Sequence, residues 1–141
     1  MRAASLLIVE DDDLDAEALE RALRKEHVIT PRFRAENGED ALRMLRGEPG
    51  FAAPPSPSLI LLDLNMPRMN GLEFLEALRS DPNPDLRRTV TFVLTTSDDP
   101  SERAAAYDHG IAGFVVKSRA GLDFRKLTQL VSDYERVVVF P

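Results

Sequence analysis

Acidic side chains follow two short apolar runs of this 141-residue chain. Glu10 and Asp11 come directly after the run Ser5–Val9, and Asp63 comes directly after the run Ser58–Leu62. Two like charges about 4 Å apart repel each other by roughly 4 kcal/mol at an effective dielectric constant near 20. If these carboxylates meet in the fold, they therefore need a bound cation or raised pKa values.

The available ligand types favour a hard cation that prefers oxygen. The sequence has no cysteine, and its two histidines, His27 and His109, do not have a zinc-binding spacing. Magnesium fits best, because it takes few protein ligands, keeps several waters and often completes its shell with a phosphate. The next acids, Asp12, Asp13 and Asp15, are instead interpreted as helix-start residues that face the positive end of a helix dipole.

A hydroxyl and an ammonium group follow two further apolar runs. Thr95 comes after Val90–Leu94, and Lys117, one of three lysines, comes after Gly113–Val116. An ammonium there can neutralise a carboxylate or hold a phosphoryl oxygen, and the Thr95 hydroxyl can donate a hydrogen bond to the same oxygen. The alternatives are a solvated lysine at a strand end and an ordinary β-branched strand residue. The sequence has no glycine-rich phosphate loop, so nucleotide binding is unsupported.

These side chains meet only if the apolar runs are strands of one parallel sheet. Four runs are nearly continuous in apolar residues, as strands buried on both faces are. A fifth run, Val28–Arg34, is more polar and contains Pro31, which cannot donate to a ladder, so we expect it at a sheet edge. Helices are expected over residues 13–26, 37–46, from Asn70, from an Asp99 cap to Gly110, and over 121–134. This alternation predicts an α/β fold with helices on both faces and a site at the carboxyl ends of the strands.

Composition limits the remaining possibilities. Hydrophobic residues make up 43% of the chain, and we expect a single domain over residues 1–141, with a core at about 5–133 and a C-terminal extension at 134–141. A net charge of −6 argues against direct nucleic-acid binding. No apolar run is long enough to span a membrane, and the N-terminus has no apolar stretch typical of a signal peptide, so we expect a cytoplasmic protein.

Three segments carry the motifs together: LLIVEDDDLDAEAL, SLILLDLNMPRMNGLEFL and FVLTTSDDPSERAAAYDHGIAGFVVKS. Residues 5 to about 133 resemble a response-regulator receiver domain of two-component signalling. The proline-rich loop, VLTTSDD and the tyrosine-containing tail are most similar to single-domain regulators paired with bacterial phytochromes. The resemblance implies a flavodoxin-like (βα)5 fold, a doubly wound parallel sheet with strand order 2-1-3-4-5.

The resemblance also implies roles for the polar residues. Asp63 is the implied phosphoacceptor, and Glu10 and Asp11 are the acidic pair, with Asp11 favoured as the direct Mg²⁺ ligand. Asn65 is implied to offer its backbone carbonyl to the metal, and Gly71 to shape the loop after the acceptor.

Three more residues have implied roles in signalling. Thr95 and Lys117 are expected to contact the phosphoryl oxygens, and Phe114 occupies the aromatic switch position. Ser118 stands where the family usually has proline after a cis peptide bond. A non-proline cis bond costs about 3 kcal/mol, which leaves the geometry of the Lys117–Ser118 link open.

The implied function is that of a response regulator. A sensor histidine kinase, in the narrower case a bacteriophytochrome, transfers a phosphoryl group to Asp63, and the domain then signals through a conformational change and protein contacts. Such a domain is a phosphoacceptor rather than an enzyme, although it assists its own phosphorylation and dephosphorylation. One alternative is a phosphorylation-independent interaction module with a receiver-like fold. Another is an aspartate-nucleophile phosphohydrolase, which needs a second aspartate where this chain has Asn65.

The end of the chain is unusually apolar. The last predicted helix has an apolar stripe, and residues 137–140 (VVVF) add a further run. Because an exposed apolar patch usually marks an interface, we expect a homodimer built on this C-terminal face. The alternative is that the tail folds back onto the chain's own core.

Overall fold

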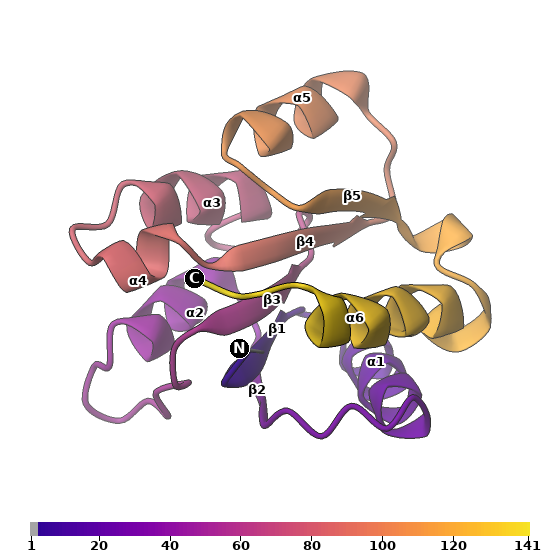
Figure 1. The fold of residues 1–141 in the computed structure, drawn as a ribbon. Coiled ribbons are helices and arrows are strands. Elements are labelled where there is room, and N and C mark those ends of the chain that lie inside the picture. Colours follow the sequence, from indigo (N-terminus) through magenta and orange to yellow (C-terminus); the bar gives the residue numbers. More distant parts are fainter. Residues whose placement is uncertain (1–2) are drawn as a thin grey trace.

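A five-stranded parallel sheet forms the centre of the molecule (Figure 1). The computed structural model describes residues 3–141. Residues 1–2 lie outside the described part, and they belong to the N-terminal segment in which we expect no signal peptide. The strand order is β2-β1-β3-β4-β5, which confirms the predicted doubly wound topology. The strands are β1 (Ser5–Val9), β2 (Arg32–Ala35), β3 (Ser58–Leu62), β4 (Val90–Thr95) and β5 (Gly113–Val116).

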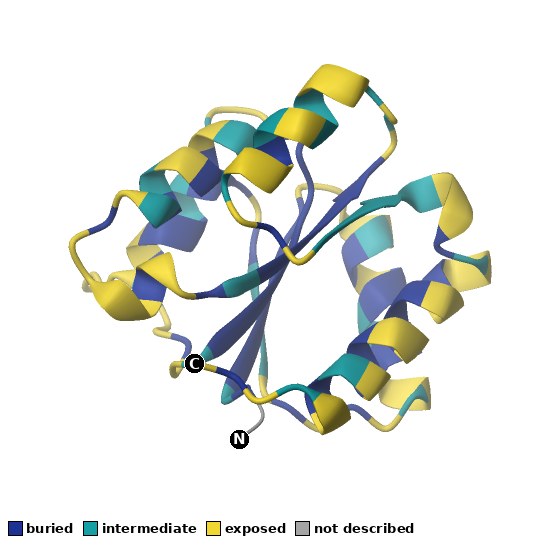
Figure 2. Cartoon of the chain, turned by 45° about the horizontal axis from the view of Figure 1, so that its top comes forward, coloured by how far each residue is buried: buried dark blue, intermediate teal, exposed yellow. Residues whose placement is uncertain are grey.

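Helices cover both faces of the sheet. One face carries α1 (Asp13–Lys25) and α6 (Arg125–Val137). The other face carries α2 (Gly38–Leu45), α3 (Gly71–Arg79), α4 (Pro84–Arg87) and α5 (Pro100–Asp108). Successive strand residues point to opposite faces, so Leu6 and Ile8 enter one core while Leu7 and Val9 enter the other. Figure 2 shows the result, a sheet whose central strands are buried between helices with exposed outer sides. The edge strands β2 and β5 are mostly half-buried, although the apolar run of β5 suggested burial on both faces.

The edge strand β2 is shorter than predicted. The expected run was Val28–Arg34, but β2 starts only at Arg32. The backbone N–H of Val28 still donates to the carbonyl of Leu23, so this residue belongs to the end of α1 rather than to the sheet. Pro31 then precedes the strand, and the predicted edge position is confirmed.

The last helix is displaced from the predicted range of 121–134. Gly121, Asp123 and Phe124 have positive φ angles of 86°, 50° and 62°, which an α-helix does not accept. The chain therefore makes two short 3-10 turns, η1 (Lys117–Arg119) and η2 (Leu122–Phe124), before α6 begins.

Side-chain caps begin two helices at the predicted places. The Asn70 side chain accepts from the Glu73 N–H, and Glu73 accepts in return from the Asn70 N–H, so that a capping box starts α3. Asp99 caps α5, and Gly110 follows that helix with a φ of 71°. The short α4 lies outside the predicted helices. Within residues 3–141, no helix combines the length and the apolar character that crossing a bilayer requires.

The C-terminal tail folds back in part. Phe140 is only 5% exposed, and its ring packs edge-on against Tyr134 with 5.8 Å between centroids. Tyr134 makes a second edge-on contact with Phe92 of β4. Val137 and Val139 remain 80% and 77% exposed. The apolar end of the chain therefore divides into one residue that extends the core and two valines that face solvent.

Candidate functional site

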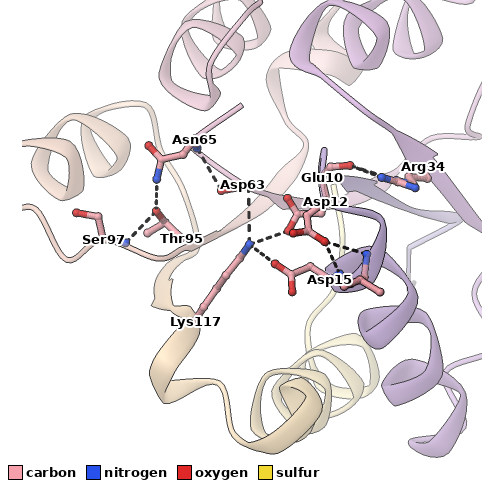
Figure 3. Close-up of polar contacts among 10 residues, drawn as sticks. Glu10, Asp12, Asp15, Arg34, Asp63, Asn65, Thr95, Ser97 and Lys117 are labelled. Carbon is pink, nitrogen blue, oxygen red and sulfur yellow. Dashed lines mark hydrogen bonds and ion pairs between the residues drawn. The ribbon is translucent and has the colours of Figure 1, made fainter. Parts of the chain in front are cut away.

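Polar side chains from four strands meet at one edge of the sheet (Figure 3). Val9 and Leu62 are register partners in β1 and β3, so the residues that follow them emerge side by side. One carboxylate oxygen each from Glu10, Asp11 and Asp63 lies within 4.8 Å of the others. The structure thus brings together the three acids that the sequence singled out.

Glu10 is the most enclosed of the three acids, with 2% exposure. Its backbone is fixed on both sides, because its N–H donates to Ala35 and its carbonyl accepts from Arg34. Oε1 accepts from the Lys117 ammonium at 2.7 Å, whereas Oε2 has no hydrogen-bond partner among the described residues. Burial, reinforced by the neighbouring Asp63 carboxylate, raises the pKa of Glu10 to about 8 against the opposing effect of Lys117.

Lys117 lies between three carboxylates. Its Nζ is 2.7 Å from Glu10 Oε1, 2.7 Å from Asp15 Oδ2 and 3.8 Å from Asp63 Oδ2. Burial of the ammonium lowers its pKa, but the hydrogen bonds to Asp15 and Glu10 outweigh burial, so the pKa stays above its usual value. The lysine therefore keeps its positive charge where the acids converge.

Asp15 is the site residue that the sequence did not single out. Its interpretation as a helix-start acid is correct in part, since it lies in the first turn of α1. Asp12 caps this helix, and Asp13 pairs with Arg34. The rotation of α1 against the sheet decides which acid faces Lys117, and the sequence pattern does not give that rotation.

The loop after Asp63 connects the acceptor position to β4. Asp63 Oδ1 accepts from the Asn65 N–H at 3.1 Å, and the Asn65 side-chain amide donates to Thr95 Oγ1 at 3.1 Å. Thr95 is fully buried, and its hydroxyl oxygen also faces the Ser97 N–H at 3.4 Å. The Thr95 hydroxyl is thus held in the site by the loop that carries the acceptor.

Close packing explains the glycine that follows this loop. A Cβ atom on Gly71 would lie 2.6 Å from the Cα of Leu64 and 2.8 Å from the carbonyl oxygen of Asp63. The start of α3 therefore rests directly on the loop, which no larger residue would permit without a backbone shift. This contact agrees with the expectation that Gly71 shapes the loop.

The fifth strand carries the remaining predicted residues. Phe114 is half-buried and packs against the margin of the core on the side of the sheet that carries α5, and its N–H donates to the Tyr107 hydroxyl at 3.2 Å. The Lys117–Ser118 peptide is trans, and the cis peptide bond among the described residues is Ser56–Pro57.

The donor set fits a hard divalent cation. Three carboxylate oxygens lie close enough to share one ion, and Glu10 Oε2 is buried with no other described partner. Asp11 is exposed, so a bound ion would keep contact with water. Oxygen donors with open solvent positions suit Mg²⁺ or Mn²⁺.

Comparison with known proteins identifies the family. Residues 6–131 match the response regulator receiver domain, and the chain therefore belongs to the response-regulator receiver family. Response regulator Rcp1 from Synechocystis sp. is 31% identical over 129 residues, which cover 92% of this chain and 86% of that protein.

Solved structures include close neighbours of the same kind. The Mn²⁺-bound form of response regulator Rcp1 has a TM-score of 0.85 at 31% identity, covering 98% of this chain and 99% of that one. The phosphorylated cyanobacterial phytochrome response regulator RcpA has a TM-score of 0.86 at 28% identity and covers 99% of both chains. Phytochrome-associated regulators are thus among the neighbours of this protein.

Proposed function

We propose that this receiver domain takes a phosphoryl group from a histidine kinase onto Asp63. The observation that carries the proposal is the position of Asp63, 7% exposed at the end of a buried strand, with the Lys117 ammonium 3.8 Å from its Oδ2. An Asp63 oxygen attacks phosphorus, a P–O bond forms, and the P–N bond to the kinase histidine breaks. The electron pair of that bond stays on the histidine.

Charge stabilisation is the main task of the surrounding residues. The three equatorial phosphoryl oxygens carry negative charge in the transition state, and Lys117 supplies one positive charge beside them. Glu10, Asp11 and Asp63 would hold Mg²⁺, together with the Asn65 carbonyl. The ion would neutralise phosphoryl oxygens and the crowded carboxylates. The Mn²⁺ reported for Rcp1 supports this assignment.

Signalling would begin at the hydrogen bond between Asn65 and Thr95. The Thr95 hydroxyl can donate to a phosphoryl oxygen on Asp63 once that group is present, which would draw β4 towards the acceptor loop. Phe114, half-buried on the adjacent strand, is the side chain that would respond. The output is then a change of packing beneath α3 and α5 that a partner protein can read.

Partner and location follow from the same proposal. The similarity to RcpA supports a bacteriophytochrome as the partner kinase. We place the domain in the cytoplasm, where the phosphorylated histidine of such a kinase lies. Water then hydrolyses the acyl phosphate to free Asp63 and inorganic phosphate, which ends the signal. We propose a phosphoacceptor that assists its own phosphorylation and dephosphorylation.

The test uses acetyl phosphate and Mg²⁺, with intact mass as the measurement. The protein should gain one labile phosphoryl group, and Asp63→Asn should abolish the gain. Asp13→Asn is the matched control, because it removes an exposed carboxylate near the same site. A wild-type protein that is never labelled would favour the phosphorylation-independent interaction module. Rapid multiple turnover would instead favour a hydrolase.

A further inference from the structure

We propose that Asp15 is a positioning residue that holds Lys117 back from Asp63 and so restrains phosphoryl uptake. This inference rests on the proposed function and deepens it. It starts from an ammonium group with three N–H donors. Two carboxylates, those of Glu10 and Asp15, take hydrogen bonds from it at 2.7 Å, whereas Asp63 Oδ2 lies 3.8 Å away, beyond hydrogen-bond distance.

Asp15 and the acceptor compete for one cation. Among residues 3–141, Lys117 is the one cationic side chain within 4.0 Å of the carboxylates of Glu10, Asp15 or Asp63. Its side chain is 13% exposed, so little water is available to replace a lost partner. When a phosphoryl group reaches Asp63, its oxygens and the Asp15 carboxylate compete for the Lys117 ammonium, and the pull of Asp15 works against the approach of Lys117 to Asp63.

The aspartate is the fixed partner in this pair. Asp15 lies in the first turn of α1, and its N–H donates to the capping carboxylate of Asp12 at 3.1 Å. Lys117 reaches the site through a long side chain with four methylene groups, so the lysine is the partner that moves.

The substitution Asp15→Asn removes the negative charge of this side chain while keeping its size and shape nearly unchanged. The amide keeps an oxygen that accepts from the Lys117 ammonium, but it carries no negative charge, so an ion pair becomes a hydrogen bond between a cation and a neutral amide. Lys117 should therefore leave more readily, and phosphoryl uptake should become faster. Asp13→Asn is the matched control, since Asp13 lies in the same helical turn and pairs with Arg34 rather than with Lys117.

The first measurement is the initial rate of phosphoryl uptake from acetyl phosphate with Mg²⁺. Asp15→Asn should raise this rate on the order of fivefold, as expected when the Lys117 ammonium loses the negative charge of one of its two close partners. Asp13→Asn should stay near the wild-type rate. In a Lys117→Gln background the gain from Asp15→Asn should disappear, because the lysine transmits it. A gain that persists without the lysine, or equal rates in the two asparagine variants, would overturn the proposal.

The second measurement does not depend on phosphorylation. The chain has three lysines, and Lys25 and Lys126 are exposed, so heteronuclear NMR of the ammonium groups should show one protected signal, from Lys117. Asp15→Asn should shift that signal in the metal-free protein, and Asp13→Asn should leave it in place. An unmoved signal would overturn the contact itself. A shifted signal in a protein that takes up no phosphoryl group would instead overturn the proposed function, and with it the restraint on uptake.

Discussion

Glu10 has two oxygens in different environments. One accepts from Lys117, and the other is buried without a partner among the described residues. Burial and the nearby Asp63 raise the pKa of Glu10 to about 8, so the folded, metal-free protein holds a proton on this group more tightly than an ordinary carboxyl group does. A cation that binds here must displace this proton, so binding of the ion and release of the proton are linked.

The unfolding free energy of the metal-free protein should therefore fall as the pH rises. The folded pKa of Glu10, about 8, lies above the ordinary value of 4.5, so the folded state binds this proton more tightly than the unfolded chain does. This contribution is complete below about pH 4.5 and is lost by about pH 8, an effect on the order of a few kcal/mol. Urea titrations in a chelator between pH 5 and 8 measure it.

Glu10→Gln should flatten this pH dependence, because the amide does not titrate. Glu17→Gln, a substitution on the exposed side of α1, should leave the slope of the wild-type protein unchanged. Equal slopes in the wild-type protein and in Glu10→Gln would contradict the assignment of the proton to Glu10.

The sequence predicted the residues of the site that directly follow a strand. Glu10, Asp63 and Lys117 occupy positions set by strand ends, and parallel strands bring their ends to one edge of the sheet. The contact between Asp15 and Lys117 depends instead on the rotation of α1 about its own axis. Hydrophobic periodicity identifies the broad apolar face of a helix that packs on the sheet, but it does not fix that rotation closely enough to show which acid faces Lys117.

Elements whose ends are not marked by the apolar pattern were harder to predict than those whose ends are. The four residues of α4 are too few to show helical periodicity, and local hydrogen bonds hold this helix in place. Positive φ angles likewise delay the start of α6 in a segment whose composition suits a helix. By contrast, β1, β3 and β5 have the predicted bounds, because their apolar runs end sharply at polar residues.

Asp81 connects α4 to the rest of that layer. Its Oδ1 accepts from the Asn83 N–H and its Oδ2 from Arg46, which caps the end of α2, both at 2.9 Å. The Asn83 N–H, followed by Arg46, lowers the pKa of Asp81. Stability from this group is therefore present above its ordinary pKa of 3.8 and lost as the pH falls through the lowered value.

Asp81→Asn should destabilise the protein by about 1 kcal/mol at pH 7, because Arg46 loses its negatively charged partner and keeps only a hydrogen bond to a neutral amide. The difference from the wild type should shrink in acid, as the wild-type carboxyl begins to take up a proton. Thermal unfolding at pH 7 and pH 3 measures both effects. Asp85→Asn, an exposed substitution on the same helix, should have little effect at either pH. A constant deficit at both pH values would rule out the ionised carboxylate as its cause.

The whole molecule presents apolar side chains on its C-terminal face. Leu130 of α6 is 45% exposed, and Val137 and Val139 are more exposed still. Phe140 instead packs into the chain's own core against Tyr134 and holds the tail in place. Val137 and Val139 of the same tail remain exposed to solvent. We propose that this face pairs with the same face of a second copy, since a two-fold axis joins identical patches.

Charged residues on this face should break the dimer without disturbing the core. The double substitution Val137→Glu and Val139→Glu should give a monomer at concentrations on the order of tens of micromolar, at which the wild type should be a dimer. Leu14→Glu, at an equally exposed position at the site end of α1, should remain a dimer. Sedimentation velocity measures all three proteins. A wild type that sediments as a monomer would refute the assembly, and a dimeric double variant would place the interface elsewhere.

The hydrogen bond between Tyr107 and the Phe114 N–H also has an optical consequence. The chain contains no tryptophan and two tyrosines, so its near-ultraviolet emission comes from Tyr107 and Tyr134. These fluorophores lie on α5 and α6, which cover opposite faces of the sheet. Replacing Tyr134 with phenylalanine would leave a single tyrosine, whose hydroxyl accepts a hydrogen bond from the Phe114 N–H of β5. Changes in the fluorescence of Tyr107 would then report changes in its hydrogen bond to β5 in real time, without an added dye.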